Sequence, residues 1–156
     1  MNLQKIEFVL VMIVLVFNIF LLYMNSDIFF DFIDRKKEIV APHDFIPEES
    51  IVAYPNQVVL KIENYSINKY APTGSMIPVL DKGANGISIK PNSEDDLHIG
   101  DIITFRENNE LIVHRIIEKG IDENGIYFIT KGDNNNVSDG KIRFSQIEGV
   151  LVALIY

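Results

Sequence analysis

The stretch 111-LIVHRIIEKGIDENGIYFITK-131 has the pattern of a β-hairpin. Leu111–Ile117 and Ile126–Lys131 are runs of strand length, rich in the β-branched and aromatic residues that favour strands. The loop between them, Asp122–Gly125, ends in Asn-Gly, two residue types that tolerate the positive φ of tight turns. The stretch therefore predicts two antiparallel strands joined by a four-residue loop.

The register of this hairpin predicts a titratable pair across the two strands. With Ile121 opposite Ile126, His114 faces Asp133, and other turn choices move that partner by only one or two residues. The Cβ atoms of a cross-strand pair lie ~4.5 to 5.5 Å apart, so an imidazole and a carboxylate can meet there. The register thus predicts contact between His114 and Asp133.

The strand face that carries His114 is apolar, because Ile112 and Ile116 share it. Apolar surroundings favour the neutral imidazole, which can accept a proton as a base. A core histidine hydrogen bonded to the backbone is the alternative interpretation. The strand pattern alone does not choose between the two.

Further strand-like runs continue from residue 51 to the end of the chain. They are Ile51–Tyr54, Val58–Ile62, Ile87–Lys90, Ile102–Phe105 and Val150–Tyr156. Turn-forming residues separate them, at Asp81-Lys82-Gly83, Asn85-Gly86 and Asn108-Asn109. After residue 50 the sequence has no helical periodicity, internal repeat or low-complexity tract. The pattern predicts a mainly β, antiparallel domain over residues 51–156.

The N-terminal part of the chain predicts a single transmembrane helix at about residues 8–24. This apolar run, broken only by Asn18, can cross most of a hydrocarbon core of ~30 Å. It is longer than the apolar region of a cleaved signal peptide and lacks a small-residue cleavage pattern, so we expect an uncleaved anchor. Aspartates interleaved with apolar residues predict an interfacial extension over residues 25–38. Residues 1–38 are therefore expected to bind the lipid bilayer.

Residues 39–50 predict a linker between the anchor and the β domain. They contain two prolines and the pair Glu48-Glu49, and they show no apolar periodicity.

The charges flanking the apolar run bear on orientation. Lys5 stands alone before it, whereas Arg35, Lys36 and Lys37 follow it, a distribution that favours a cytoplasmic β domain. The alternative is that these three cations pair with neighbouring acids or lipid headgroups and oppose translocation only weakly.

Composition excludes several classes of function. The chain has 156 residues, 47% of them hydrophobic, and a net charge of −8, which speaks against a nucleic-acid partner because phosphate binding needs clustered Lys and Arg. It has no cysteine, so neither a disulfide framework nor a thiol nucleophile is available. His43 and His98 lie in polar stretches without metal-ligand spacing and are expected to be surface residues. No metal and no cofactor is predicted.

The stretch 72-PTGSMIP-78 predicts a serine held in a fixed backbone. Gly74 can adopt a φ that other residues avoid, and the two flanking prolines restrict the chain on either side. The Ser75 hydroxyl is thereby presented at one position, as a nucleophile requires. The alternative is an ordinary Pro/Gly turn with an exposed serine.

Four short motifs together resemble the signal peptidase I family of serine peptidases. They are Thr73-Gly74-Ser75-Met76-Ile77-Pro78, Gly100-Asp101-Ile102-Ile103, Val113-His114-Arg115-Ile116, and Lys131-Gly132-Asp133-Asn134-Asn135 followed by Asp139. Their order and spacing carry the resemblance over about residues 72–156. Histidine in the third motif, where the usual bacterial enzymes have lysine, makes the chain similar to the endoplasmic reticulum and archaeal type.

The resemblance implies a role for each site residue. Ser75 attacks the substrate, His114 is the base and Asp139 orients it, with Asp133 also expected to matter. The oxyanion donors are the Ser75 backbone N–H and the Thr73 hydroxyl, although the Thr73 hydroxyl can also cap the turn. The hairpin register points instead to Asp133 as the partner of His114, so the choice of aspartate stays open. Two further charged residues, Asp101 and Arg115, are interpreted as structural.

The function that the resemblance implies is a membrane-bound serine endopeptidase cleaving signal peptides from exported pre-proteins. Its β domain is of signal peptidase type, single-pass anchored in the cell membrane, with the catalytic part extracytoplasmic. Strands near 51–70 are expected to be an elaboration of the family pattern. The alternative is a catalytically silent, membrane-tethered β-module of the same fold that binds peptides or an assembly.

Overall fold

The structure is a computed structural model that describes residues 3–34 and 39–156, with side chains described for residues 4–6, 8–22 and 39–156. The chain divides into two compact units after Glu38.

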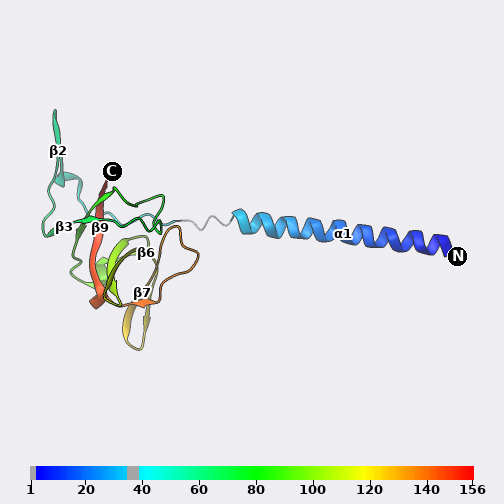
Figure 1. The fold of residues 1–156 in the computed structure, drawn as a ribbon. Helices are drawn as coiled ribbons and strands as arrows, with labels where there is room; N and C mark the ends of the chain where they lie inside the picture. Colours follow the sequence, from blue (N-terminus) through cyan, green and yellow to red (C-terminus); the bar gives the residue numbers. More distant parts are fainter. Residues whose placement is uncertain (1–2, 35–38) are drawn as a thin grey trace. The chain divides into compact units, whose positions relative to one another are not determined.

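The first unit contains one long helix, α1 (Leu3–Asp34), drawn in blue in Figure 1. Its segment Gln4–Leu22 has a mean hydropathy of 2.5 and is long and apolar enough to cross a membrane. The described side chains of Phe8 to Leu22 are all exposed, as expected for a surface that faces lipid rather than protein. The apolar N-terminal helix is thus confirmed. The basic residues Arg35, Lys36 and Lys37 lie outside the described residues.

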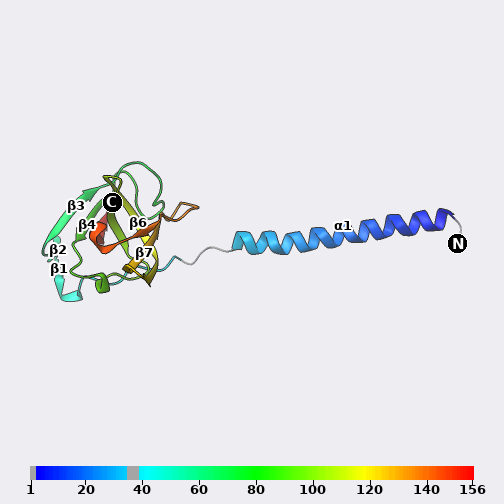
Figure 2. The ribbon, with the colours of Figure 1, turned by 90° about the horizontal axis from the view of Figure 1, so that it is seen from below.

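The second unit is built around a seven-stranded sheet in the order β3-β4-β9-β5-β6-β7-β8. Its strands are β3 (Tyr65–Lys69), β4 (Asn85–Ile89), β5 (Ile102–Glu107), β6 (Glu110–Asp122), β7 (Gly125–Lys131), β8 (Lys141–Ile142) and β9 (Ile147–Ile155). Every neighbouring pair is antiparallel, which confirms the mainly β, antiparallel fold class. Figure 2 shows β4, β6 and β7 around the interior of this unit.

A separate two-stranded hairpin, β1 (Ile51–Tyr54) and β2 (Gln57–Leu60), projects from the sheet (Figure 1). The expected elaboration over residues 51–70 therefore has two parts. One is this hairpin, and the other is β3, which joins the edge of the main sheet.

Two strands were not predicted from the sequence, and one predicted turn is wrong. The strands are β3, in which polar residues dilute the β pattern, and the very short β8. Asn85-Gly86, predicted as a turn, lies inside β4. Gly86 is needed for close packing rather than for a turn, because a Cβ there would collide with the Tyr70 hydroxyl.

Two apolar clusters form the interior of the domain. The larger combines side chains of β5 to β9 with Leu97, which precedes β5: Leu97, Ile103, Phe105, Ile116, Phe128, Ile142, Ile147 and Val150. The smaller contains Met76, Leu80, Ala84 and Ile102. Met76 directly follows Ser75, so burial of its side chain fixes residues 72–78, here called the serine loop, to the core.

Residues 39–50 do not form the free linker that the sequence predicts. Phe45 packs against the larger core cluster, and residues 48–50 form a short 3₁₀ turn, η1. The backbone N–H of His43 donates to Asp101 Oδ1 over 2.7 Å. The prolines and glutamates that resemble linker sequence therefore belong to a segment docked on the β domain.

A bulge in β6 changes the predicted hairpin register. Near the loop the pairing is as expected, with Ile121 opposite Ile126. Ile116 pairs with Thr130 but Glu118 with Ile129, so the residue between them is an extra one in β6 and shifts the remaining pairs by one position. The prediction that His114 faces Asp133 is therefore wrong.

Candidate active site

The serine loop is held in place by a turn that follows β7. Ser75 O accepts a hydrogen bond from Asn134 N over 2.9 Å, and Gly74 O accepts one from Asn134 Nδ2 over 3.1 Å. Gly74 has φ +70°, the left-handed conformation for which the sequence analysis singled it out. Asn134 is a site residue that the sequence analysis did not assign, and its place in a Gly-Asp-Asn turn was the available signal.

Gly132 allows the same turn to approach Ser75 closely. A Cβ at Gly132 would lie 2.6 Å from Ser75 O, closer than real Cβ contacts allow, so only glycine fits. Gly132 follows Lys131, and Lys131 pairs with Arg115, the neighbour of His114 on β6. The serine loop therefore lies at the end of the strand pair that carries His114.

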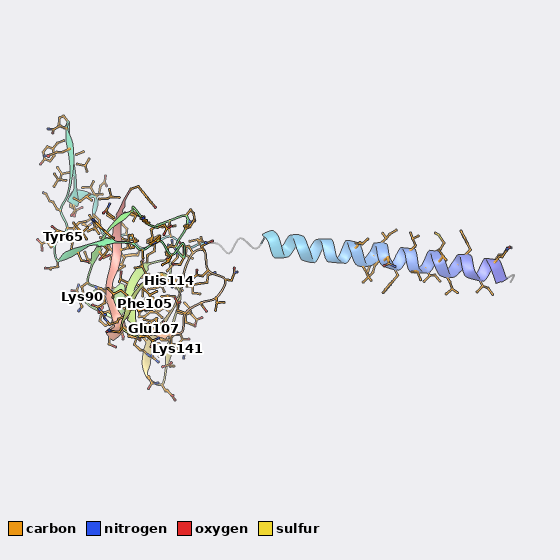
Figure 3. All side chains as sticks on the ribbon, viewed as in Figure 1. Tyr65, Lys90, Phe105, Glu107, His114 and Lys141 are labelled. Atoms are coloured by element: carbon orange, nitrogen blue, oxygen red, sulfur yellow. The ribbon has the colours of Figure 1, made fainter. Side chains whose placement is uncertain are left out.

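His114 and Asp139 are in direct contact. His114 Nδ1 and Asp139 Oδ2 are 2.7 Å apart, and the side chains are 9% and 17% exposed. The rings of His114 and Phe105, both labelled in Figure 3, have their centroids 6.4 Å apart. An ionised Asp139 fixes the proton on Nδ1, which leaves Nε2 free to accept another.

Thr130 on β7 holds Asp139 in turn. Its Oγ1 donates to Asp139 Oδ2 over 2.7 Å, and Asp139 N donates to Thr130 O over 2.8 Å. Thr130 is fully buried, so this hydroxyl has a fixed position. The sequence analysis did not single out Thr130; its alternation with Phe128 along β7 is the only signal that places it inside.

The Ser75 hydroxyl lies next to Thr73. Their Oγ atoms are 3.2 Å apart, and Ser75 N donates to Thr73 Oγ1 over 3.4 Å. Among the hydrogen bonds of residues 39–156, none joins Ser75 Oγ to His114. Catalytic hydrogen bonds are often made only once substrate is bound. The two predicted oxyanion donors, the Ser75 N–H and the Thr73 hydroxyl, are therefore neighbours that are hydrogen bonded to each other in this structure.

Asp133 contacts Arg115 instead of His114. Arg115 Nε and Nη2 donate to the two Asp133 oxygens over 2.8 and 2.7 Å, and the side chains are 6% and 3% exposed. The remaining Arg115 nitrogen donates to Gly100 O over 2.8 Å. A buried two-bond ion pair of this kind orders the turn that contains Asn134.

Asp133→Asn is expected to lower the free energy of unfolding by about 3 kcal/mol, because it leaves the buried Arg115 guanidinium without its counter-charge. Chemical denaturation of the detergent-solubilised chain measures the change. Glu148→Gln is the matched control: it removes one partner of the half-exposed Arg106–Glu148 pair and is expected to cost less than about 1 kcal/mol. Equal losses in the two variants would contradict a structural role for Asp133.

The far end of the loop that carries Asp139 is fastened by a second ion cluster. Lys141 and Arg143 both bind the Asp122 carboxylate, over 2.6 Å and 2.8 Å. The Lys141 hydrogen bond, followed by that of Arg143, lowers the pKa of Asp122 well below its usual range. The loop between β7 and β8 is thus held at both ends.

Asp101, interpreted as structural from the sequence, is a fully buried carboxylate that binds two backbone N–H groups. Its two oxygens accept the His43 and His98 backbone N–H groups, each over 2.7 Å. His43 and His98 are exposed, as predicted, and their imidazoles stack on each other with centroids 4.3 Å apart. Among the described residues no group of three His, Cys, Asp or Glu side chains is placed to hold a metal ion.

Comparison with known proteins gives relatives for part of the chain. No family model matches it. The chain is 45% identical over 71 residues to the signal peptidase complex catalytic subunit sec11 of Dictyostelium discoideum. It is 40% identical over 70 residues to the signal peptidase complex catalytic subunit SEC11C of Homo sapiens, with the same values for Mus musculus.

The aligned stretch is 43% of this chain, and it spans only 38% of the Dictyostelium protein and 36% of the mammalian ones. Within that stretch the resemblance to the signal peptidase family is confirmed.

Proposed function

We propose that this chain is a membrane-anchored serine endopeptidase that removes signal peptides from secretory pre-proteins. The observation that supports this most is the His114–Asp139 contact at 2.7 Å, in a chain whose relatives are named as signal peptidase catalytic subunits. Ser75 is held by Asn134, in the turn that follows β7. The histidine base supports the endoplasmic reticulum and archaeal type. The apolar helix α1 supplies the membrane anchor.

In the proposed reaction, His114 Nε2 accepts the Ser75 Oγ proton as that oxygen attacks the scissile carbonyl carbon. The Ser75 N–H and the Thr73 hydroxyl stabilise the resulting oxyanion. His114 then gives its proton to the leaving amine, and the C–N bond breaks to leave an acyl-serine. Water, deprotonated by His114, attacks this ester and regenerates Ser75. Asp139 stabilises the imidazolium at each proton transfer, and no cofactor is needed.

A catalytically silent β-module is the second candidate. The observation that favours it is that Ser75 Oγ is hydrogen bonded to Thr73 and not to His114. Paired peptides with the same apolar segment, one with Ala and one with Phe just before the expected cut, separate the candidates. The resemblance to signal peptidases implies a small residue just before the cut, so a peptidase is expected to cleave only the Ala peptide. A binding module binds without cleaving either.

Thr73→Ala is expected to lower kcat by about 10²- to 10³-fold, the usual effect of losing one oxyanion donor. Thr73→Ser is the matched control, since it keeps the hydroxyl that lies 3.2 Å from Ser75 Oγ. Steady-state cleavage of the Ala peptide gives kcat and KM for both variants. Equal losses in Thr73→Ala and Thr73→Ser would mean that the threonine serves only the shape of the turn.

We further propose that the β domain lies on the extracytoplasmic side of the cell membrane, despite the basic residues 35–37. The chain has no cysteine, so Glu48→Cys introduces a single thiol into it. Labelling of this thiol in intact cells therefore reports the topology of the chain with no other thiol of the same chain reacting. Glu48 is exposed and is expected to react with a membrane-impermeant thiol reagent from outside. Asn2→Cys, which precedes the helix in the sequence, is the control and should react only after the membrane is breached. The reverse pattern would exclude the proposed substrates.

A further inference from the structure

The segment Val40–His43, here called the lead-in segment, lies against two buried charged residues, Arg115 and Asp101. Val40 O accepts a hydrogen bond from Arg115 Nη1 over 3.3 Å. His43 N donates to Asp101 Oδ1 over 2.7 Å. Gly100 permits this approach, because a Cβ there would fall against the carbonyl oxygen of Ala41. The lead-in segment is thus part of the hydrogen-bond shell of both charges.

Arg115 connects this shell to both halves of the proposed active site. It follows His114 on β6, and it grips Asp133 with two hydrogen bonds of 2.8 and 2.7 Å. Asp133 precedes Asn134, whose amide and side chain hold the carbonyls of Ser75 and Gly74. Hydrogen bonds therefore lead from the lead-in segment through Arg115 to Asp133, and the peptide chain from Asp133 to Asn134 completes the path to the backbone of Ser75.

Asp101 provides a second connection, to the strand that carries the base. Ile116 N donates to Asp101 O over 2.8 Å, and Gly100 N donates to Ile116 O over 2.9 Å. Ile116 lies two residues beyond His114 on β6. Displacement of the lead-in segment would leave a buried Asp101 oxygen without its donor, and that cost favours movement of the Gly100–Asp101 turn against β6.

We propose that the lead-in segment is a positioning element of the active site. By supplying a hydrogen-bond acceptor to Arg115 and a donor to Asp101, it holds Ser75 and His114 in their positions relative to each other. This inference rests on the proposed function. A displacement of about 1 Å at such groups costs up to about 100-fold in rate.

The test compares Gly100→Ala with Gly125→Ala in the full chain in detergent. Both glycines have nearly the same positive φ, +105° and +99°, so the backbone strain is matched. Only the Gly100 Cβ meets the lead-in segment, whereas nothing lies within 4 Å of a Cβ at Gly125. Amide hydrogen exchange, read by mass spectrometry, and cleavage kinetics are measured on both.

Gly100→Ala is expected to speed exchange at residues 40–43 and also at Asn134. It should lower kcat by about 10- to 100-fold with little change in KM. Gly125→Ala should show neither effect. Faster exchange at residues 40–43 with unchanged exchange at Asn134 would overturn the proposal, because the segment would then be merely docked. The exchange result stands whether or not the chain proves to be a peptidase, so failure of one hypothesis is distinct from failure of the other.

His43→Pro and His43→Ala decide the matter if Gly100→Ala does not fold. Proline removes the N–H that Asp101 accepts, while alanine keeps it and loses only the imidazole that stacks on His98. The proposal expects faster exchange at Asn134 and a lower kcat in His43→Pro only. Equal behaviour of the two variants would contradict it.

Discussion

Ser75→Ala is expected to reduce turnover by about 10⁴-fold or more while leaving the fold intact, and His114→Ala should do the same. Members of a nucleophile–base pair act as a unit, so loss of either removes most of the rate enhancement. Among the side chains of residues 39–156, the Ser75 hydroxyl is hydrogen bonded only to Thr73, and that hydrogen bond is exposed, so removal of the hydroxyl is expected to cost little stability. Cleavage of a peptide or pre-protein substrate by matched amounts of each variant gives the rates.

Thermal unfolding of the same samples is the control for folding. The double variant Ser75→Ala/His114→Ala should be no slower than either single one, because the second substitution removes a group that already lacks its partner. Full activity in either single variant would leave the silent β-module as the surviving candidate.

Asp139→Asn is expected to lower kcat by about 10³- to 10⁴-fold with KM nearly unchanged. Asp139 Oδ2 accepts a hydrogen bond from the Thr130 hydroxyl and forms another with His114 Nδ1. An amide that turns its NH₂ toward Nδ1 favours the tautomer protonated on Nε2, and this tautomer cannot take the serine proton. Single-turnover kinetics separate this loss from any effect on substrate binding.

Ser138→Ala is the matched control for Asp139→Asn, since Ser138 is its exposed neighbour in the same loop. The Ser138→Ala variant should cleave the substrate at the rate of the unsubstituted chain. A fully active Asp139→Asn beside a stable but inactive Asp133→Asn would reverse the assignment of the two aspartates, whatever the distances in the structure.

The β architecture was predictable because it depends on local patterns. Alternating Ile, Val, Tyr and Phe runs and the Asn-Gly loop predicted β6, β7 and their connection. The bulge between Ile116 and Glu118 was not predictable, because nothing in a run of apolar residues marks which one is extra. That single residue moved Asp133 away from His114 and onto Arg115.

The site was predictable where it depends on motifs, and less so where it depends on tertiary contacts. The stretch around Ser75 and the His114 strand were singled out from the sequence, and the structure brings both to one end of the β6–β7 pair. The choice of aspartate required the path of the loop from Gly132 to Gly140. Docking of residues 39–50 depends on Asp101 and Arg115, which lie far away in the sequence. Taken by themselves, the prolines and glutamates of residues 39–50 therefore resembled a linker.

The most direct test of the central claim is the N-terminal sequence of the product formed when the detergent-solubilised full chain is incubated with a model secretory pre-protein. The account predicts one new N-terminus, located after a small residue that ends the signal peptide, and no product with Ser75→Ala. No cleavage by the intact chain, or the same product from Ser75→Ala, would contradict the account.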